Sequence, residues 1–213
     1  MPEEQVSTID YYVWLLSDWA YLGGVRFVQL AARHRLKINH IPMRMQDVYA
    51  GSGGVLLANR SWQRQAYRIT ELKRWRSRLG ILVNIEPKFY PTDVDLASRV
   101  VIAAQQRGLP VADFVNAVMR AVWAEDQNVA DPTVLVAIAK RCGLEGRGLL
   151  DAADAEAVRA EYRGNTERAL SAGVFGSPFY AFAGELFWGQ DRLEMLEEAV
   201  VGSATGNLGR SPG

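Results

Sequence analysis

The N-terminal part of the chain alternates between short apolar runs and a helical pattern. Residues 9–16 are rich in aromatic and branched side chains, which is typical of a buried strand. Ser17 and Asp18 then form an N-cap signal, and an apolar helical pattern follows them. A second strand is predicted over residues 36–45, so the spacing fits a parallel βαβ unit. Pro42 places part of this strand at a sheet edge or a bulge.

The middle of the chain, residues 58–172, has helical periodicity almost throughout. A Gly-rich loop over residues 50–54 is expected to lead into this block. The first helix ends at Gly80, and its apolar stripe predicts one buried face. The stripe comprises Trp62, Ala66, Ile69, Leu72, Trp75 and Leu79. Two prolines predict an irregular loop over residues 84–91. Four more helices are predicted over residues 93–107, 111–127, 132–142 and 155–172.

Strand character returns near the C-terminus. Residues 178–182 and 185–188 read as a hairpin, and a last helix is predicted to begin at Gln190. The order is therefore βαβ, about 100 residues of helix, then ββα, which predicts an α/β fold with one sheet and a large helical insertion. We expect residues 7–57 and 173–201 to form the sheet domain. Residues 58–172 would be the insertion, and the Gly- and Ser-rich residues 202–213 a disordered tail.

Composition narrows the class of protein. The chain has 213 residues, of which 49% are hydrophobic and 23% charged, as in ordinary globular proteins. Lys and Arg number 24 and so do Asp and Glu, so the net charge favours neither nucleic acid nor an anionic membrane. No apolar stretch is long enough to cross a bilayer, and the acidic start lacks the features of a signal peptide. With Cys142 alone, no internal disulfide can form. We expect a cytoplasmic protein.

One segment departs from this neutral balance. Residues 60–78 carry seven basic side chains against one acid, Glu71, and Trp62, Tyr67 and Trp75 lie among them. Such a segment either binds an anionic polymer or forms a solvated basic helix face whose aromatic residues belong to the core. The zero net charge favours the second interpretation, so no nucleic-acid partner is expected.

Candidate chemistry is sparse. His34 and His40 are the only histidines, and no cluster has the spacing of metal ligands or of a Ser-His-Asp site. Cys142 fits a small core residue of its predicted helix. Ser17 stands out, because a hydroxyl at a helix start lies beside free N–H groups and the positive end of the helix dipole. Taken alone, Ser17 either only caps its helix or also stabilises an anion.

Several motifs together resemble a known family. The order of elements is that of a thioredoxin-like domain, and the helical insertion resembles the disulfide-oxidoreductase and kappa-class glutathione transferase branch. The sequence Ser-Asp-Trp-Ala at residues 17–20 stands where redox members carry Cys-x-x-Cys, so dithiol exchange is excluded. Residues 173–178 look like the cis-proline loop, and residues 184–193 look like the closing motif. With residues 64–75, these motifs most resemble the 2-hydroxychromene-2-carboxylate isomerase family, over about residues 9–200.

The resemblance implies a glutathione-dependent isomerase of aromatic catabolism with a small aromatic carboxylate as substrate, needing no metal and acting as a homodimer. It implies that the Ser17 hydroxyl contacts the glutathione sulfur and that Ser177 presents its backbone to the cysteinyl part. Gln190 and Asp191 would hold the γ-glutamyl end. The implied glutathione-binding set comprises Ser17, Trp19, Gly54, Ser177, Pro178, Gln190 and Asp191. Ser17 would be the catalytic residue, and the bond before Pro178 would be cis.

The chain also departs from the family pattern. Many members have Pro after the active serine, where this chain has Asp18, and a carboxylate there opposes a neighbouring thiolate unless it points away or caps the helix. Ala50 and Gly54 stand where members often have Lys and Asn, and Asn59 or Arg60 is a candidate replacement. Three functions therefore stay open: the isomerase, a kappa-like glutathione transferase or peroxidase, and a non-catalytic thioredoxin-like binding protein.

Overall fold

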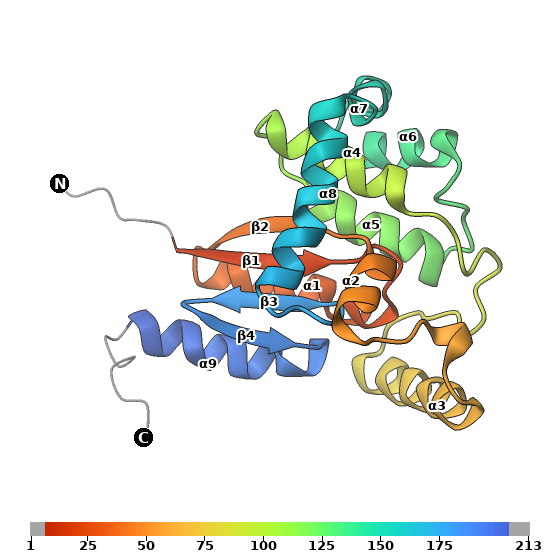
Figure 1. Cartoon of the computed structure of the whole chain (residues 1–213), viewed down its shortest axis with the longest axis vertical. Helices are drawn as coiled ribbons and strands as arrows, with labels where there is room; N and C mark the ends of the chain where they lie inside the picture. Colours follow the sequence, from red (N-terminus) through yellow and green to blue (C-terminus); the bar gives the residue numbers. More distant parts are fainter. Residues whose placement is uncertain (1–6, 205–213) are drawn as a thin grey trace.

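The computed structural model describes residues 7–204 and has a four-stranded sheet surrounded by helices (Figure 1). The strands are β1 (Thr8–Val13), β2 (Lys37–Pro42), β3 (Phe179–Phe182) and β4 (Glu185–Trp188). The α-helices are α1 (Asp18–Arg33), α2 (Met45–Ser52), α3 (Trp62–Leu79), α4 (Asp95–Gln106), α5 (Ala112–Trp123), α6 (Pro132–Arg141), α7 (Gly146–Ala153), α8 (Glu156–Ser171) and α9 (Leu193–Ala204). Two short 3-10 helices are η1 (Leu57–Asn59) and η2 (Gln190–Arg192).

The sheet joins the two ends of the chain. Its strand order is β2-β1-β3-β4, with β1 parallel to β2 and antiparallel to β3. Tyr11 is the central residue of this register, opposite His40 on one side and Tyr180 on the other. The predicted βαβ and ββα units are therefore confirmed. The edge position indicated by Pro42 is also confirmed, since β2 is an outer strand.

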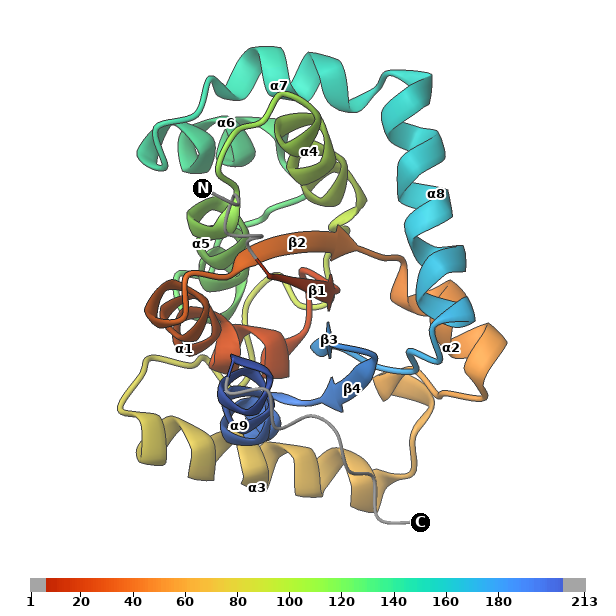
Figure 2. The same cartoon turned by 90° about the vertical axis from the view of Figure 1, so that its left-hand side faces the viewer.

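Helices cover both faces of the sheet. Figure 2 shows α1 and α9 on one face and α2 and α8 on the other. Successive side chains of β1 point to opposite faces of the sheet, as the pleat of a strand requires. Tyr11 packs into the main core, where its ring centroid lies 4.7 Å from that of Phe27 in α1. Tyr12 points the other way, into a second cluster with Val48 of α2 and Ala169 of α8.

The helical block lies between β2 and β3 in the sequence and forms much of the main core. α5 buries seven of its twelve residues, among them Phe114 and Trp123. The predicted start of the helix at Pro132 is confirmed, and Asp131 caps α6, since its side chain accepts a hydrogen bond from Thr133 N–H. α7 was not predicted, because two glycines and a length of only eight residues give it a weak helical pattern.

The segment predicted as a flexible Gly-rich loop is partly helical, so that prediction was wrong for residues 50–52. α2 runs through them because Met45 and Val48 bury one side of the helix against the sheet. The helix ends only at Gly53, whose φ of 75° is the left-handed conformation that closes a helix and that glycine adopts without strain.

The predicted buried stripe of α3 is wrong in its first half. Trp62 is 74% exposed and Tyr67 is 61% exposed, while Leu72 is the one fully buried residue of this helix. The expectation that the aromatic residues of the basic segment belong to the core is therefore wrong for these two. The physical reason is that the first turns of α3 border a cavity, which Gln65 and Arg68 line, rather than the core.

The chain end differs from the prediction by a few residues. α9 continues to Ala204, so residues 202–204, placed in the tail by the sequence analysis, are helical. Residues 205–213 of that predicted tail lie outside the described residues. Within the described range 7–204, no helix is both long and apolar enough to cross a membrane.

Candidate active site

Ser17 stands at the start of α1, immediately after the turn that follows β1. Its backbone is extended (φ −75°, ψ 120°), and its hydroxyl accepts a hydrogen bond from Ala20 N–H at 3.2 Å. This is the geometry of an N-cap, so the predicted cap is confirmed. The side chain is also held near the positive end of the helix dipole, which stabilises an anion placed beside it.

The loop before β3 meets Ser17 across 160 residues of sequence. The Ser17 hydroxyl donates to the Ser177 carbonyl oxygen at 2.9 Å, and Trp14 N–H donates to the Ser177 hydroxyl at 2.9 Å. The Ser177–Pro178 peptide bond is cis, as the family resemblance implied. The Pro178 carbonyl accepts a hydrogen bond from Gly189 N–H at 3.0 Å. The fold therefore brings two of the predicted site residues into direct contact.

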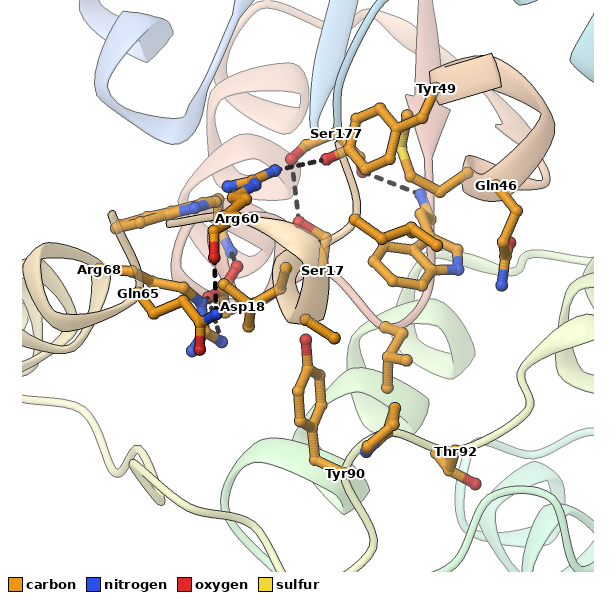
Figure 3. A pocket seen from close by; sticks show the side chains of 18 residues that line it. Ser17, Asp18, Gln46, Tyr49, Arg60, Gln65, Arg68, Tyr90, Thr92 and Ser177 are labelled. Atoms are coloured by element: carbon orange, nitrogen blue, oxygen red, sulfur yellow. Dashed lines mark hydrogen bonds and ion pairs between the residues drawn. The ribbon is translucent and has the colours of Figure 1, made fainter. Parts of the chain in front are cut away.

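A cavity of about 430 Å³ opens over Ser17 (Figure 3). Ser17, Trp19 and Ser177 all line it, which places three predicted site residues around one space. Tyr49 of α2 and Tyr90 of the loop after α3 contribute to its walls on opposite sides. Its other apolar lining residues are Trp14, Leu16, Met45, Leu56, Leu57, Ala58 and Pro91. Such walls fit a flat apolar ligand.

Asp18, the departure from the family pattern, is paired with a cation. Its Oδ2 lies 2.6 Å from both Nε and Nη2 of Arg68, and its Oδ1 accepts from Trp19 N–H at 2.8 Å. Both side chains are nearly buried, at 9% and 12% exposed. Burial raises the pKa of the Asp18 carboxyl, and the Arg68 guanidinium and the Trp19 N–H oppose that rise. The Asp18 carboxylate is thus matched by the Arg68 cation.

A second cavity of about 350 Å³ adjoins the first, and the two share Trp19, Arg60 and Ser177 in their walls. Gln190 and Asp191 line the second cavity, as do the aromatic side chains of Trp75 and Trp188. The Gln190 side chain is buried and accepts a hydrogen bond from Arg26, whereas the Asp191 carboxylate is exposed and pairs with Arg192 at 3.0 Å. The fold therefore brings this predicted pair close to Ser17.

Arg60 has a different environment from Arg68. Its Nε donates to the Val55 carbonyl at 2.8 Å and its Nη2 donates to the Tyr49 hydroxyl at 3.1 Å. Over residues 7–204, no carboxylate forms an ion pair with it. A guanidinium that is held in place by neutral groups, without a counter-ion, is suited to bind an anionic ligand.

Gly54 lies apart from the other predicted site residues. It is exposed, it follows the end of α2, and it lines neither of the two cavities. A Cβ at this position would overlap the ring of Tyr49, so close packing accounts for glycine here. The candidate replacement Asn59 is also absent from the lining of both cavities, whereas Arg60 belongs to both.

Sequence reasoning missed Arg68, Tyr49 and Tyr90 as site residues. Each comes from a different segment, and nothing local marks any of them as facing a ligand. The one available signal was the position of Arg68 and Gln65 on the side of α3 that also carries Leu72. Polar residues on the packed side of a helix often border a cavity or pair with a buried charge.

The fold and the site define the class of protein. The sequence model of the DSBA-like thioredoxin domain family matches residues 8–201, and the chain belongs to this family. The chain is also similar to several enzymes named 2-hydroxychromene-2-carboxylate isomerase. One, the 2-hydroxychromene-2-carboxylate isomerase of Sphingobium xenophagum, is 28% identical over 92% of this chain and 98% of the relative.

Solved structures show the same likeness. The structure of a 2-hydroxychromene-2-carboxylate isomerase superimposes with a TM-score of 0.76 at 26% identity, covering 96% of this chain and 100% of the other. The cytosolic disulfide reductase DsbM from Pseudomonas aeruginosa, solved with GSH, superimposes with a TM-score of 0.66 at 19% identity, covering 94% and 98%. The second comparison shows the shared fold only.

Proposed function

We propose that the protein is a glutathione-dependent isomerase that interconverts 2-hydroxychromene-2-carboxylate and trans-o-hydroxybenzylidenepyruvate. The observation that carries the proposal is the position of Ser17, whose hydroxyl lies at the N-terminus of α1 and contacts the loop of the cis proline. The likeness to isomerases over nearly the whole chain supports the same reaction.

The residues around Ser17 fit a bound tripeptide thiol. The Ser17 hydroxyl and the N-terminus of α1 suit the sulfur. Ser177 lies beside them and lines both cavities, so a ligand bound there would contact it. Asp191, exposed on the wall of the adjoining cavity, suits the ammonium group of the γ-glutamyl end.

When bound, glutathione supplies a thiolate that adds reversibly to the conjugated double bond and leaves after rotation about the resulting single bond. Ser17 stabilises the anionic sulfur by donating its one hydroxyl proton. That proton is donated to the Ser177 carbonyl in the structure, so the hydroxyl turns away from this carbonyl to act. The apolar walls at Tyr49 and Tyr90 hold the aromatic ring and exclude water from it.

The decisive test follows ring opening of 2-hydroxychromene-2-carboxylate by absorbance, with and without glutathione, and measures glutathione binding by calorimetry. We expect turnover that depends on glutathione. Absence of glutathione binding would instead favour a non-catalytic thioredoxin-like binding protein. Binding without ring opening, but with conjugation to another electrophile, would favour a kappa-like transferase.

Arg60 is the residue we assign to the substrate carboxylate, since its guanidinium lines the cavity and no carboxylate in the described part of the chain pairs with it. We expect Arg60→Gln to raise KM for the chromene about 10- to 100-fold, because a hydrogen bond to a charged group contributes about 1.5–3 kcal/mol. Arg60→Lys should recover part of this loss.

The matched control is Arg163→Gln, which removes an exposed guanidinium of α8 that pairs with Glu156. It should leave KM for the chromene unchanged. The assignment is wrong if Arg60→Gln weakens glutathione binding in calorimetry and leaves KM for the chromene as it was, because Arg60 would then bind the cofactor.

A further inference from the structure

Asp18 places a carboxylate next to the proposed thiolate site. It is the first residue of α1, it follows Ser17 directly, and its side chain is 9% exposed. A negative charge at this depth acts through little solvent, so it would raise the pKa of a thiol beside Ser17 and work against the helix dipole. Its charge must be balanced if the site is to hold an anion.

Arg68 provides that balance from another element. It extends from α3, fifty residues away in the sequence, and two of its nitrogens lie 2.6 Å from one Asp18 oxygen. Its guanidinium carbon also lies 5.6 Å from the ring centroid of Tyr90 and 5.5 Å from that of Trp123. In addition to the ion pair, these two ring contacts hold the Arg68 guanidinium in one place.

The other titratable groups that line the cavity above Ser17 are Arg60, Tyr49 and Tyr90. Burial raises the pKa of Tyr90, so this tyrosine is neutral at physiological pH. The charges of Asp18 and Arg68 cancel each other. The cavity lining therefore has one net positive charge, which belongs to Arg60. Without Arg68, an ionised Asp18 would offset Arg60 instead, and Asp18 is the charge adjacent to Ser17.

We propose that Arg68 is a positioning residue that sets the charge at Ser17: by holding and neutralising Asp18, it leaves the N-terminus of α1 free to stabilise a thiolate. The inference deepens the proposed function and rests on it for the identity of that thiolate. The departure from the family pattern at Asp18 is thereby compensated within this chain by Arg68.

The test measures the electrostatics of the site without glutathione. Ser17→Cys is made together with Cys142→Ser, which removes the other thiol of the chain. The ultraviolet absorbance of the thiolate is then followed against pH. Arg68→Met in this background should raise the thiol pKa, so that the thiolate fraction at neutral pH falls about tenfold, as expected when the partner of an adjacent carboxylate is lost.

A second substitution separates charge from structure. Adding Asp18→Asn to Arg68→Met should restore the titration, because the repelling charge is then gone. Arg68→Lys should retain part of the effect. The matched control is Arg74→Met, which removes an exposed cation from the same helix, paired with Glu71 at 2.5 Å, and should leave the titration unchanged.

The inference is wrong if Arg68→Met leaves the titration unchanged, or if Asp18→Asn does not reverse its effect. Should Arg68→Met not fold, Asp18→Asn alone decides, because an uncompensated Arg68 should increase the thiolate fraction and an unchanged fraction contradicts the proposal. Since no glutathione is present, a failure of glutathione binding in calorimetry would overturn the proposed function and leave this result standing.

Discussion

At the scale of single residues, the Ser17 hydroxyl has two roles to fill with one oxygen. It caps α1 by accepting from Ala20 N–H, and it has one proton to donate, which in the structure goes to Ser177. A lone pair is enough for the cap, so the proton is available for a ligand without loss of the helix start. Ser17 is therefore a structural cap that also fits a catalytic role.

We expect Ser17→Ala to lower turnover on the order of 100-fold, as when one donor to a developing anion is removed. Loss of the cap should also cost about 1 kcal/mol of stability. The measurements are glutathione-dependent ring opening and denaturant unfolding. Asp131→Ala is the matched control, because it removes the N-cap of α6, and it should lose similar stability with full activity. Full activity in purified Ser17→Ala would contradict the role of Ser17.

His40 makes stability depend on pH. Its side chain is 5% exposed beside Tyr11, and burial lowers its pKa from 6.5 to about 4. The unfolded chain therefore binds a proton on His40 between these two values while the folded chain does not. Stability is full above pH 6.5 and falls as the pH drops toward 4.

The expected loss over this window is about 3 kcal/mol, from a pKa difference of this size. Urea unfolding of the native protein and of His40→Gln at several pH values measures it. We expect the variant to lose less stability on acidification than the native protein. Equal slopes for the two proteins would show that His40 is not buried in its neutral form.

At the scale of elements, α3 packs weakly against the rest of the molecule, because little of its surface is buried. Leu72 is its one buried residue, packed with Leu22 of α1 and Val83, and the Asp18–Arg68 pair is a further contact with α1. α5, by contrast, buries seven residues in the main core. Because local opening costs less where fewer apolar groups are buried, α3 should open more readily than α5.

Native-state hydrogen exchange checks this expectation. The amides of α3 should exchange on a faster time scale than those of α5, and Arg68→Met should increase the difference by removing a tie of α3 to α1. Equal protection of the two helices would contradict it. A mobile α3 would carry Gln65 and Arg68 with it, so its opening would also open the cavity wall.

At the scale of the whole molecule, the sheet brings the two ends of the chain together, and the site forms at their junction. Ser17 follows β1 in the sequence, and Ser177 precedes β3. Because β1 and β3 are neighbouring strands, the Ser17 hydroxyl lies within hydrogen-bond distance of the Ser177 carbonyl. The loop after α3 and the end of α2 complete the cavity with Tyr90 and Tyr49. No single segment of the chain contains the site.

The homodimer that the family resemblance implies remains a prediction at this scale. We expect sedimentation equilibrium to give twice the chain mass of 23.7 kDa. Large exposed apolar side chains on and beside α3, namely Trp62 and Leu82, are consistent with a partner surface. A monomer at micromolar concentration would contradict the prediction. Cytoplasmic location and the lack of a nucleic-acid partner likewise remain predictions.

Much of the fold was predictable because its signals are local. Ser17 and Asp131 mark helix starts through their own side chains, and Gly80 marks a helix end through its left-handed backbone. The hairpin followed from a short local pattern, whereas the cis bond before Pro178 was expected only from the family resemblance. α7 and the helical course of residues 50–52 were not predictable, because tertiary burial outweighs their weak propensity.

The sequence by itself determined the order of elements, the cap at Ser17, and the exclusion of dithiol chemistry, since each depends on residues close together in the chain. The folded arrangement was needed to see that Asp18 meets Arg68 and that Trp62 faces solvent. It was also needed to see that Arg60 is held by the Val55 carbonyl and the Tyr49 hydroxyl. The physical reason is that charge pairing and burial depend on which distant segments the fold brings together. No local pattern encodes a contact across fifty residues.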